Sequence, residues 1–187
     1  MLQAPPNGFV LRFLMPVWIM EIFIGWVVPI NIFKMKIKNL KKFNEKDWTW
    51  ILQYAYPQDE YYNNSNTAFY QSFDEAPSEI IKFADKHFQK NYSITMIKQP
   101  PASFIPRHKD KHYRFKSTNK KIDAKKIVRY CIFLQDWKPG QYFEYDDKPV
   151  APWSKGDMIV LKPGVYHRSG NCGTQFKYTL QITGLLN

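Results

Sequence analysis

Cysteine is scarce in this chain, and its scarcity excludes two kinds of protein. Only Cys131 and Cys172 are present among 187 residues, too few for a disulfide framework or a thiolate zinc site. Glycine and proline number only 8 and 13, which excludes collagen-like and linker-like chains. Because 44% of the residues are hydrophobic and 17% are aromatic, the chain can bury a core, so a disordered protein is also excluded. The length suits about one domain.

Acidic residues are also few relative to basic ones. The 27 Lys and Arg residues outnumber the 16 Asp and Glu residues, which gives a net charge of +11. Two segments carry much of the excess, a lysine-rich run at 34–42 and a basic segment at 111–126. A surface with this balance attracts acidic ligands or partners.

The longest apolar run covers residues 9–33 and is long enough to cross a bilayer, which takes about 20 residues. Against a membrane span, Glu21 near its middle would cost roughly 3 kcal/mol on insertion scales, and Pro16 and Pro29 interrupt a helix. No cleavage site with small residues follows the run, so we expect no removable signal peptide.

Two main interpretations of this segment remain open, besides a less favoured helix that lies in the membrane interface. In the first, residues 9–33 anchor the protein in a membrane, and the lysines that follow place the rest of the chain in the cytoplasm. In the second, translation starts at Met35, and residues 1–34 are upstream sequence. Both predict a hydrophobic segment at 1–34 and a cytoplasmic domain at 35–187, which agrees with two isolated cysteines.

The first part of the domain shows helical patterns. Asn44 is a favourable N-cap residue and apolar residues follow it at helical spacing, which predicts a helix ending before Pro57. Residues 58–74 are rich in Asn and Tyr and predict a surface loop. Pro77 suits the first turn of a helix, and the apolar spacing after it predicts a second helix over about 77–90.

The second part of the domain shows strand patterns. Short runs of β-forming residues alternate with turn residues, and the expected strands are 93–98, 127–135, 141–145, 157–161 and 176–183. We therefore predict a mainly β fold in which two N-terminal helices pack against an antiparallel sheet or barrel.

Three residues in this second part form a candidate metal site. His108 and Asp110 are two positions apart, so in an extended chain their side chains project from the same face. His167 follows the expected strand 157–161. Two histidines and one carboxylate on one face of a metal form the facial triad of non-haem Fe(II) oxygenases. Neutral imidazoles and a carboxylate suit Fe(II) and leave other coordination positions open.

The last expected strand adds a cation to this pattern. Strict alternation over 176–183 places Lys177 and Thr179 on one face and a row of apolar side chains on the other. A buried ammonium is costly unless an anion meets it, so we expect Lys177 to bind an anionic ligand.

Together these residues resemble the Fe(II)- and 2-oxoglutarate-dependent oxygenases, and the lysine fits the prolyl-4-hydroxylase-like branch best. The resemblance covers most of residues 92–184. It includes the phrases Gly140-Gln141-x-Phe143, Trp153-x-x-Gly156-Asp157, His167-x-x-x-Asn171 and Gln181-x-Thr183-Gly184. Two departures separate the chain from other branches. It carries Thr183 where nucleic-acid demethylases have a second arginine, and it keeps the aspartate that aspartyl hydroxylases lack.

The resemblance implies a double-stranded β-helix, also described as a jelly-roll or cupin-like fold. It also implies that His108, Asp110 and His167 bind Fe(II), while Lys177 and Thr179 hold the distal carboxylate of 2-oxoglutarate. The implied activity is a dioxygenase that hydroxylates a peptidyl or small-molecule substrate and converts 2-oxoglutarate and O₂ to succinate and CO₂. Arg129 lies on an expected strand and would either contact 2-oxoglutarate or substrate, or form a structural ion pair.

Two other functions are compatible with the same residues. One is a non-catalytic β-barrel that serves as a binding module. The other is a cupin-type metalloenzyme that does not use 2-oxoglutarate, for which Lys177 would point away from the metal. The sequence has no feature that fixes the oligomeric state.

The basic segment 111–126 has a plain interpretation as a solvated loop, or it covers the mouth of the site and steers an acidic substrate. Nucleic acid is a further candidate partner, since Tyr113 and Phe115 would stack on bases while the cations contact phosphates. We rank nucleic acid lower because a basic loop alone does not specify it. Residues 9–33 make a membrane the remaining candidate partner.

Overall fold

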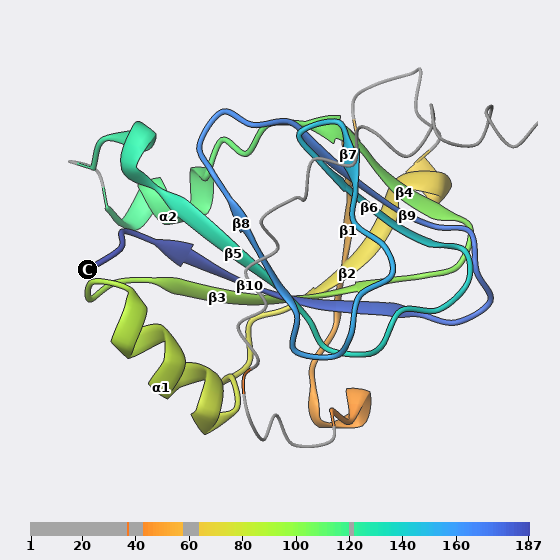
Figure 1. Ribbon diagram of the computed structural model, residues 1–187, viewed down its shortest axis with the longest axis horizontal. Helices are drawn as coiled ribbons and strands as arrows, with labels where there is room; N and C mark the ends of the chain where they lie inside the picture. The colour runs from red at the N-terminus through yellow and green to blue at the C-terminus, as the bar shows by residue number, and fades with distance from the viewer. Residues whose placement is uncertain (1–36, 38–42, 58–63, 120–121) are drawn as a thin grey trace, which may run out of the picture.

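The computed structural model describes residue 37 and residues 43–57, 64–119 and 122–187, and most of them fold into two antiparallel sheets (Figure 1). The larger sheet has the order β1-β2-β3-β10-β5-β8, and the smaller has the order β4-β9-β6-β7. The strands are β1 (Ile51–Tyr54), β2 (Ala68–Ser72), β3 (Ser93–Gln99), β4 (Ser103–His108), β5 (Val128–Phe133), β6 (Gln141–Tyr145), β7 (Lys148–Pro149), β8 (Met158–Leu161), β9 (His167–Asn171) and β10 (Lys177–Gly184). The α-helices are α1 (Ser78–His87) and α2 (Tyr113–Thr118), and single 3₁₀ turns cover Glu45–Asp47, Asn64–Thr67 and Ala124–Lys126.

Strands β3 to β10 pass back and forth between the two sheets. β3, β5, β8 and β10 belong to the larger sheet, and β4, β6, β7 and β9 to the smaller. Two facing four-stranded antiparallel layers connected in this way form a jelly roll, the double-stranded β-helix. The predicted mainly β architecture is therefore confirmed, and β1 and β2 extend one layer beyond it.

Alternation along the strands sorts side chains between the interior and the outer face of the larger sheet. On β10, Leu180 and Ile182 face outward and are buried against α1, whereas Lys177 and Thr179 face a cavity between the sheets. Elsewhere the space between the sheets is filled by a second apolar cluster, in which the rings of Phe133 and Trp153 stack at 4.1 Å. One part of the barrel is thus packed, and another is open for ligands.

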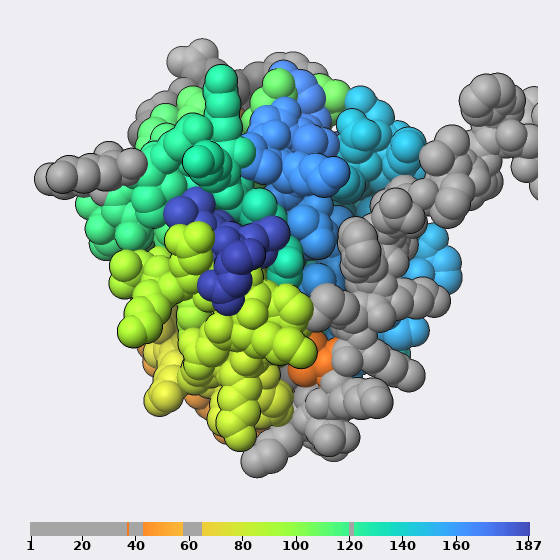
Figure 2. Space-filling view, turned by 60° about the vertical axis from the view of Figure 1, so that its left-hand side comes forward, coloured from red at the N-terminus to blue at the C-terminus, as the bar shows by residue number. Residues whose placement is uncertain are grey.

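Helix α1 covers the outer face of the larger sheet (Figure 1). It corresponds to the second of the two expected helices, the one predicted over about 77–90. Ile80 and Ala84 lie one turn apart on its buried face and are fully inaccessible to solvent. The C-terminal residues lie against the end of this helix (Figure 2), where the backbone of Asn187 donates to the carbonyl of His87. α1 is thus fastened to the sheet on one face and at its end.

The helix expected from Asn44 to Pro57 is wrong. Asn44 does cap a turn, since its side chain accepts from the backbone N–H of Lys46, but only one 3₁₀ turn follows before strand β1. Pairing of β1 with β2 satisfies the backbone instead, and the half-buried residues Trp48 and Trp50 alternate as they do in extended chain. Tertiary pairing has overridden a local helical pattern.

The surface loop expected at 58–74 is also wrong in part, because it contains strand β2, which pairs with both β1 and β3. Residues 58–63 of this prediction lie outside the described residues. Strands β4 and β9 were not expected, and the expected loop 111–126 contains α2 and a 3₁₀ turn. The five predicted strands from 93 to 183 are confirmed within one or two residues at each end.

The hydrophobic segment 9–33, the division at residue 34 and the membrane interpretation lie outside the described residues. Within the part of the chain that the structure describes, no helix combines the length and apolarity that a bilayer crossing demands.

Gly140 is expected to be the glycine least tolerant of substitution. It has φ +85°, and a Cβ there would lie 2.5 Å from the backbone nitrogen of Gly173. Gly140→Ala should therefore lower the free energy of unfolding by about 3 kcal/mol, through left-handed strain and overpacking together. Gly164 is the matched control, because it has φ +76° but open space around its Cβ position, so Gly164→Ala should cost only about 1 kcal/mol. Urea denaturation measures both, and equal losses would contradict the steric explanation.

Candidate metal centre

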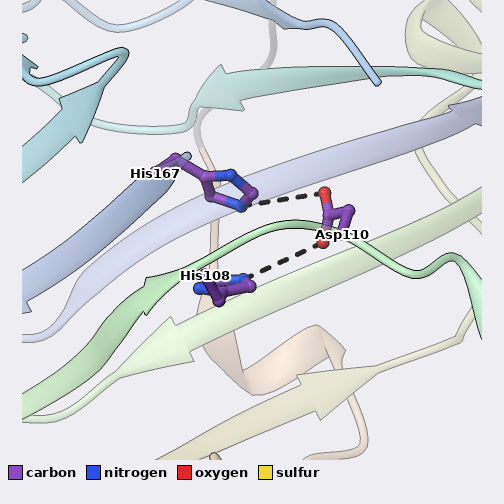
Figure 3. A group of neighbouring side chains, drawn as sticks. All are labelled: His108, Asp110 and His167. Carbon is purple, nitrogen blue, oxygen red and sulfur yellow. Dashed lines mark ion pairs between the residues drawn. The ribbon is translucent and has the colours of Figure 1, made fainter. Parts of the chain in front are cut away.

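Two neighbouring strands bring the three candidate ligands together (Figure 3). His108 ends β4 and His167 begins β9, and the two residues face each other in the antiparallel register, with ring centroids 4.3 Å apart. Asp110 follows two residues after β4 and turns back between them. Its carboxylate lies 3.9 Å from Nε2 of His108 and 3.7 Å from Nε2 of His167. One potential ligand atom from each residue lies within 4.8 Å of the other two, a grouping that could hold a metal ion.

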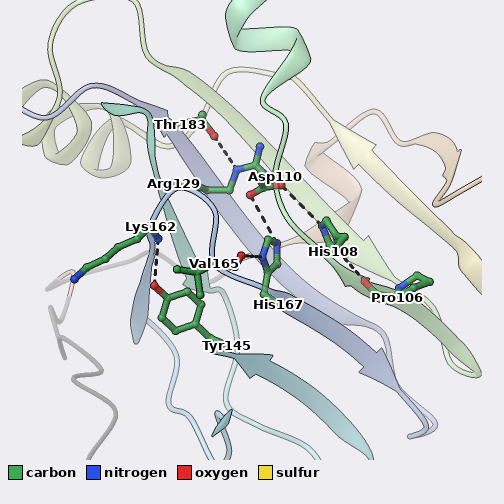
Figure 4. A network of polar contacts seen from close by, with 9 residues as sticks. All are labelled: Pro106, His108, Asp110, Arg129, Tyr145, Lys162, Val165, His167 and Thr183. Atoms are coloured by element: carbon green, nitrogen blue, oxygen red, sulfur yellow. Dashed lines mark hydrogen bonds and ion pairs between the residues drawn. The ribbon is translucent and has the colours of Figure 1, made fainter. Parts of the chain in front are cut away.

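The backbone orients both imidazoles. Nδ1 of His108 lies 2.7 Å from the carbonyl oxygen of Pro106, and Nδ1 of His167 lies 3.5 Å from that of Val165 (Figure 4). A proton on each Nδ1 donates to these carbonyls and leaves the lone pair of Nε2 facing Asp110. This is the arrangement in which histidines bind metals, with the second ring nitrogen held by a backbone oxygen. Pro106 fits here because β4 is an edge strand with an irregular register at this point.

The carboxylate of Asp110 uses its two oxygens differently. Oδ1 accepts a hydrogen bond of 2.8 Å from Nη1 of Arg129, and Nε of Arg129 donates to the hydroxyl of Thr183 at 3.0 Å (Figure 4). Oδ2 is buried and has no hydrogen-bond partner among the residues that the structure describes. A buried carboxylate oxygen without a partner is costly, so its position 3.7 Å from Nε2 of His167 fits a cation that is bound there.

The protonation states also suit metal binding. Burial lowers the pKa of His167 to about 4, so its imidazole is neutral at pH 7 and able to donate a lone pair. Burial would raise the pKa of Asp110, but the charge of Arg129, followed by the nearby imidazoles, outweighs it and leaves that pKa below its ordinary value. The site therefore holds an ionised carboxylate beside a neutral imidazole, which is the state that metal ligands need.

A cavity of about 310 Å³ connects the candidate ligands to Lys177. Lys177 and Thr179 line this cavity together with His108, Asp110 and His167. Lys177 is only 2% exposed, and burial lowers its pKa to about 7. Its ammonium donates to the Tyr142 carbonyl, the Ser169 hydroxyl and the Gly170 carbonyl. These acceptors are neutral, and within the described part of the chain no carboxylate pairs with this lysine.

Arg129 lines the same cavity, but its guanidinium pairs with Asp110. The sequence left a ligand contact and an ion pair open, and the structure contains the ion pair. The pair fixes Oδ1 of Asp110 and leaves Oδ2 facing Nε2 of His167. Arg129 is thus placed to orient a candidate ligand.

Ser169 is the site residue that the sequence did not suggest. Its hydroxyl accepts from Lys177 and donates to the side chain of Gln99 at 2.7 Å. The signal is present, because Ser169 lies two residues after His167 and so shares its face in an extended chain. It was missed because β9 was not expected as a strand.

His112 and Asn171 stand near the site without joining the group of three. His112 adopts a left-handed conformation with φ 49° at the start of α2 and offers no atom to the group that could hold a metal ion. Asn171 is buried, and its side chain bonds the backbone of Gln99, Gly173 and Gln175, so it stabilises the turn that follows β9.

No family model matches the chain, and no curated protein matches it. Solved structures do match in architecture. A predicted oxalate decarboxylase from Thermotoga maritima is 16% identical, with 76% of this chain and 97% of that chain covered and a TM-score of 0.46. KdgF from Halomonas sp. is 10% identical, with 76% and 94% covered and a TM-score of 0.42. An uncharacterised protein with a double-stranded β-helix domain from Klebsiella pneumoniae is 13% identical, with 54% and 72% covered and a TM-score of 0.37.

Proposed function

We propose that this protein is a metalloenzyme of the double-stranded β-helix fold, and more finely an Fe(II)- and 2-oxoglutarate-dependent dioxygenase. In this proposal His108, Asp110 and His167 hold the metal, and Lys177 with Thr179 holds the distal carboxylate of 2-oxoglutarate. The product is a hydroxylated peptide or small molecule, with succinate and CO₂ formed from 2-oxoglutarate and O₂.

The donor set supports the metal. The two Nε2 atoms lie 3.9 and 3.7 Å from the carboxylate of Asp110, and two histidines with one carboxylate are the ligand set of non-haem Fe(II) oxygenases. Fe(II) bound there would supply the activation of O₂. The protein's own groups orient the donors, since the carbonyls of Pro106 and Val165 hold the imidazoles and Arg129 holds the carboxylate.

The burial of Lys177 beside the candidate metal ligands is the observation that supports the use of 2-oxoglutarate. A buried ammonium that pairs with no carboxylate of the described residues lines the same cavity as the three candidate ligands. Neutral oxygens compensate a buried cation less well than an anion does. A dicarboxylic keto acid that bridges the metal and Lys177 would supply that anion, and the Thr179 hydroxyl stands two residues along the same face to donate to it.

One observation favours a cupin-type metalloenzyme that does not use 2-oxoglutarate. The Lys177 ammonium already has three oxygen acceptors, which matches its capacity of three donors. In a cupin-type enzyme, Lys177 would connect β6 and β9 through these hydrogen bonds and would bind no ligand. The two functions share the metal and differ only in the role of this lysine.

Anaerobic titration separates these functions. Addition of Fe(II) and then 2-oxoglutarate to the full chain should produce the weak visible absorption of the chelate, and exposure to air should then yield succinate. A cupin-type enzyme would bind Fe(II) without the absorption band or succinate. Absence of saturable Fe(II) binding would overturn both functions and leave a non-catalytic binding module.

A further inference from the structure

A second cavity of about 280 Å³ lies beside the candidate metal centre, on the side of Arg129 and Asp110 away from Lys177. Helix α2 and strands β3, β5 and β10 form its walls. Hydrogen-bonding side chains dominate it, and they come from adjacent register positions, since Ser93 pairs with Thr183 and Thr95 pairs with Gln181. Its lining also includes Asp110, Lys111, Arg114 and Arg129, so its interior suits a polar group.

An open groove of about 560 Å³ joins this cavity at Asp110, Lys111, His112 and Tyr113, which line both. Four lysines line the groove: Lys111, Lys116, Lys125 and Lys162. They come together because Arg129 pairs with Leu161 across β5 and β8, so the 3₁₀ turn before β5 and the residue after β8 lie at the same end of the sheet. Helix α2 closes the opposite wall of the groove.

The charge of this groove is uncompensated. Among the described residues that line it, the one carboxylate belongs to Asp110, which is already paired with Arg129. None of the four lysines pairs with a carboxylate in the part of the chain that the structure describes. Four ammonium groups around one groove, whose Asp110 carboxylate is already paired with Arg129, form a positive field that ends at the candidate metal centre.

We infer that this groove binds a phosphate ester and that the substrate of the proposed enzyme carries it, an inference that rests on the proposed function. The cations of the groove are lysines, which bind phosphate as point charges. A phosphate dianion can meet more than one ammonium at once. The group to be modified then extends from the phosphate into the polar cavity beside Asp110.

Tyr113 supplies a contact for the organic part of the ester. It is 69% exposed at the lip of the groove, and the ammonium groups of Lys111 and Lys116 lie 5.8 and 5.5 Å from its ring centroid. An exposed aromatic ring between phosphate-binding cations suits a planar group such as a base. Nucleotides and nucleic-acid strands share this chemistry, so the test includes both.

The test is a binding titration by calorimetry on the metal-free full chain, with adenosine monophosphate and an oligothymidylate as probes. The variant Lys116→Glu with Lys125→Glu should weaken binding of the preferred probe at least tenfold. The variant Lys82→Glu with Lys90→Glu carries the same charge change on exposed residues of α1 and the turn after it, and should bind within twofold of the unaltered protein. Raising the salt concentration should weaken binding, because phosphate contacts are screened.

The binding titration tests the inference separately from the proposed function, because the titration involves no turnover, iron or 2-oxoglutarate. Binding of the oligonucleotide tenfold tighter than that of adenosine monophosphate would identify a nucleic-acid strand as the source of the phosphate. Comparable affinities for the two probes would identify a small phosphate ester. Absence of saturable binding at millimolar probe, equal losses in the two double variants, or equally tight binding of citrate would overturn the inference.

Discussion

An Asp110→Asn variant is expected to bind Fe(II) at least ~100-fold more weakly than the unaltered protein, since loss of outer partners alone typically costs ~10- to 100-fold. The amide of asparagine can still accept from Arg129, so the fold should persist. It lacks the negative charge that the carboxylate offers to the two Nε2 atoms. Competition with a chromophoric chelator under anaerobic conditions measures the affinity, and succinate formation should fall with it.

Asp147→Asn is the matched control. Asp147 also pairs with an arginine, Arg107, at 2.9 Å, but both side chains lie at the surface. Its substitution should leave Fe(II) affinity unchanged and cost less than about 1 kcal/mol of stability, as exposed ion pairs do. Equal Fe(II) affinity in the Asp110 and Asp147 variants would show that the buried carboxylate is not a ligand.

Asp110→Ala should differ from Asp110→Asn in stability. Alanine leaves the guanidinium of Arg129 without its partner in a mostly buried position, and unpairing a buried charge costs about 3 kcal/mol or more. Comparing the two variants by urea denaturation therefore separates the structural role of the Arg129 pair from the metal-binding role of the other oxygen.

The strands were predictable where one face is buried and the other is chemically distinct. On β10 the alternation of Leu180 and Ile182 with Lys177 and Thr179 reports the two environments directly. Near Asn44 the same reasoning failed, because capping and helical spacing are local signals, while pairing between β1 and β2 depends on residues beyond the turn. A local pattern identifies an element when burial agrees with it.

The residues of the site were also partly predictable. His108 and Asp110 are found by spacing within one segment, and the structure brings them together with His167 through the register of β4 and β9. The partner of Arg129 could not be predicted, because whether its guanidinium contacts a ligand or Asp110 depends on the distance between two segments of the chain. The neutral acceptors around Lys177 could not be predicted either, since two of the three are backbone carbonyls. Residue types do not specify where backbone carbonyls lie.

A Lys177→Met variant is expected to raise the KM for 2-oxoglutarate by about 100-fold or more, in line with the cost of removing one partner of a buried charge pair. Methionine has a similar length and no charge, so it fills the space between the sheets. Fe(II) affinity should stay within a fewfold of the unaltered protein, because the hydrogen bonds of Lys177 go to Tyr142, Ser169 and Gly170 and not to a candidate metal ligand within the described part of the chain. A large loss of Fe(II) affinity together with the rise in KM would point to a general disturbance of the barrel.

The pH dependence of 2-oxoglutarate binding tests the same lysine without a mutation. Burial lowers the pKa of Lys177 to about 7, so in the unliganded protein the ammonium loses its proton above that pH. A bound carboxylate favours the charged form, and affinity should therefore fall by up to about tenfold per pH unit above 7. His167, whose pKa lies near 4, does not titrate in this range. Anaerobic titrations from pH 6.5 to 8.5 should show this slope in the unaltered protein and none in Lys177→Met. A flat profile in both would instead favour the cupin-type enzyme, in which the three neutral oxygens are the permanent partners of Lys177.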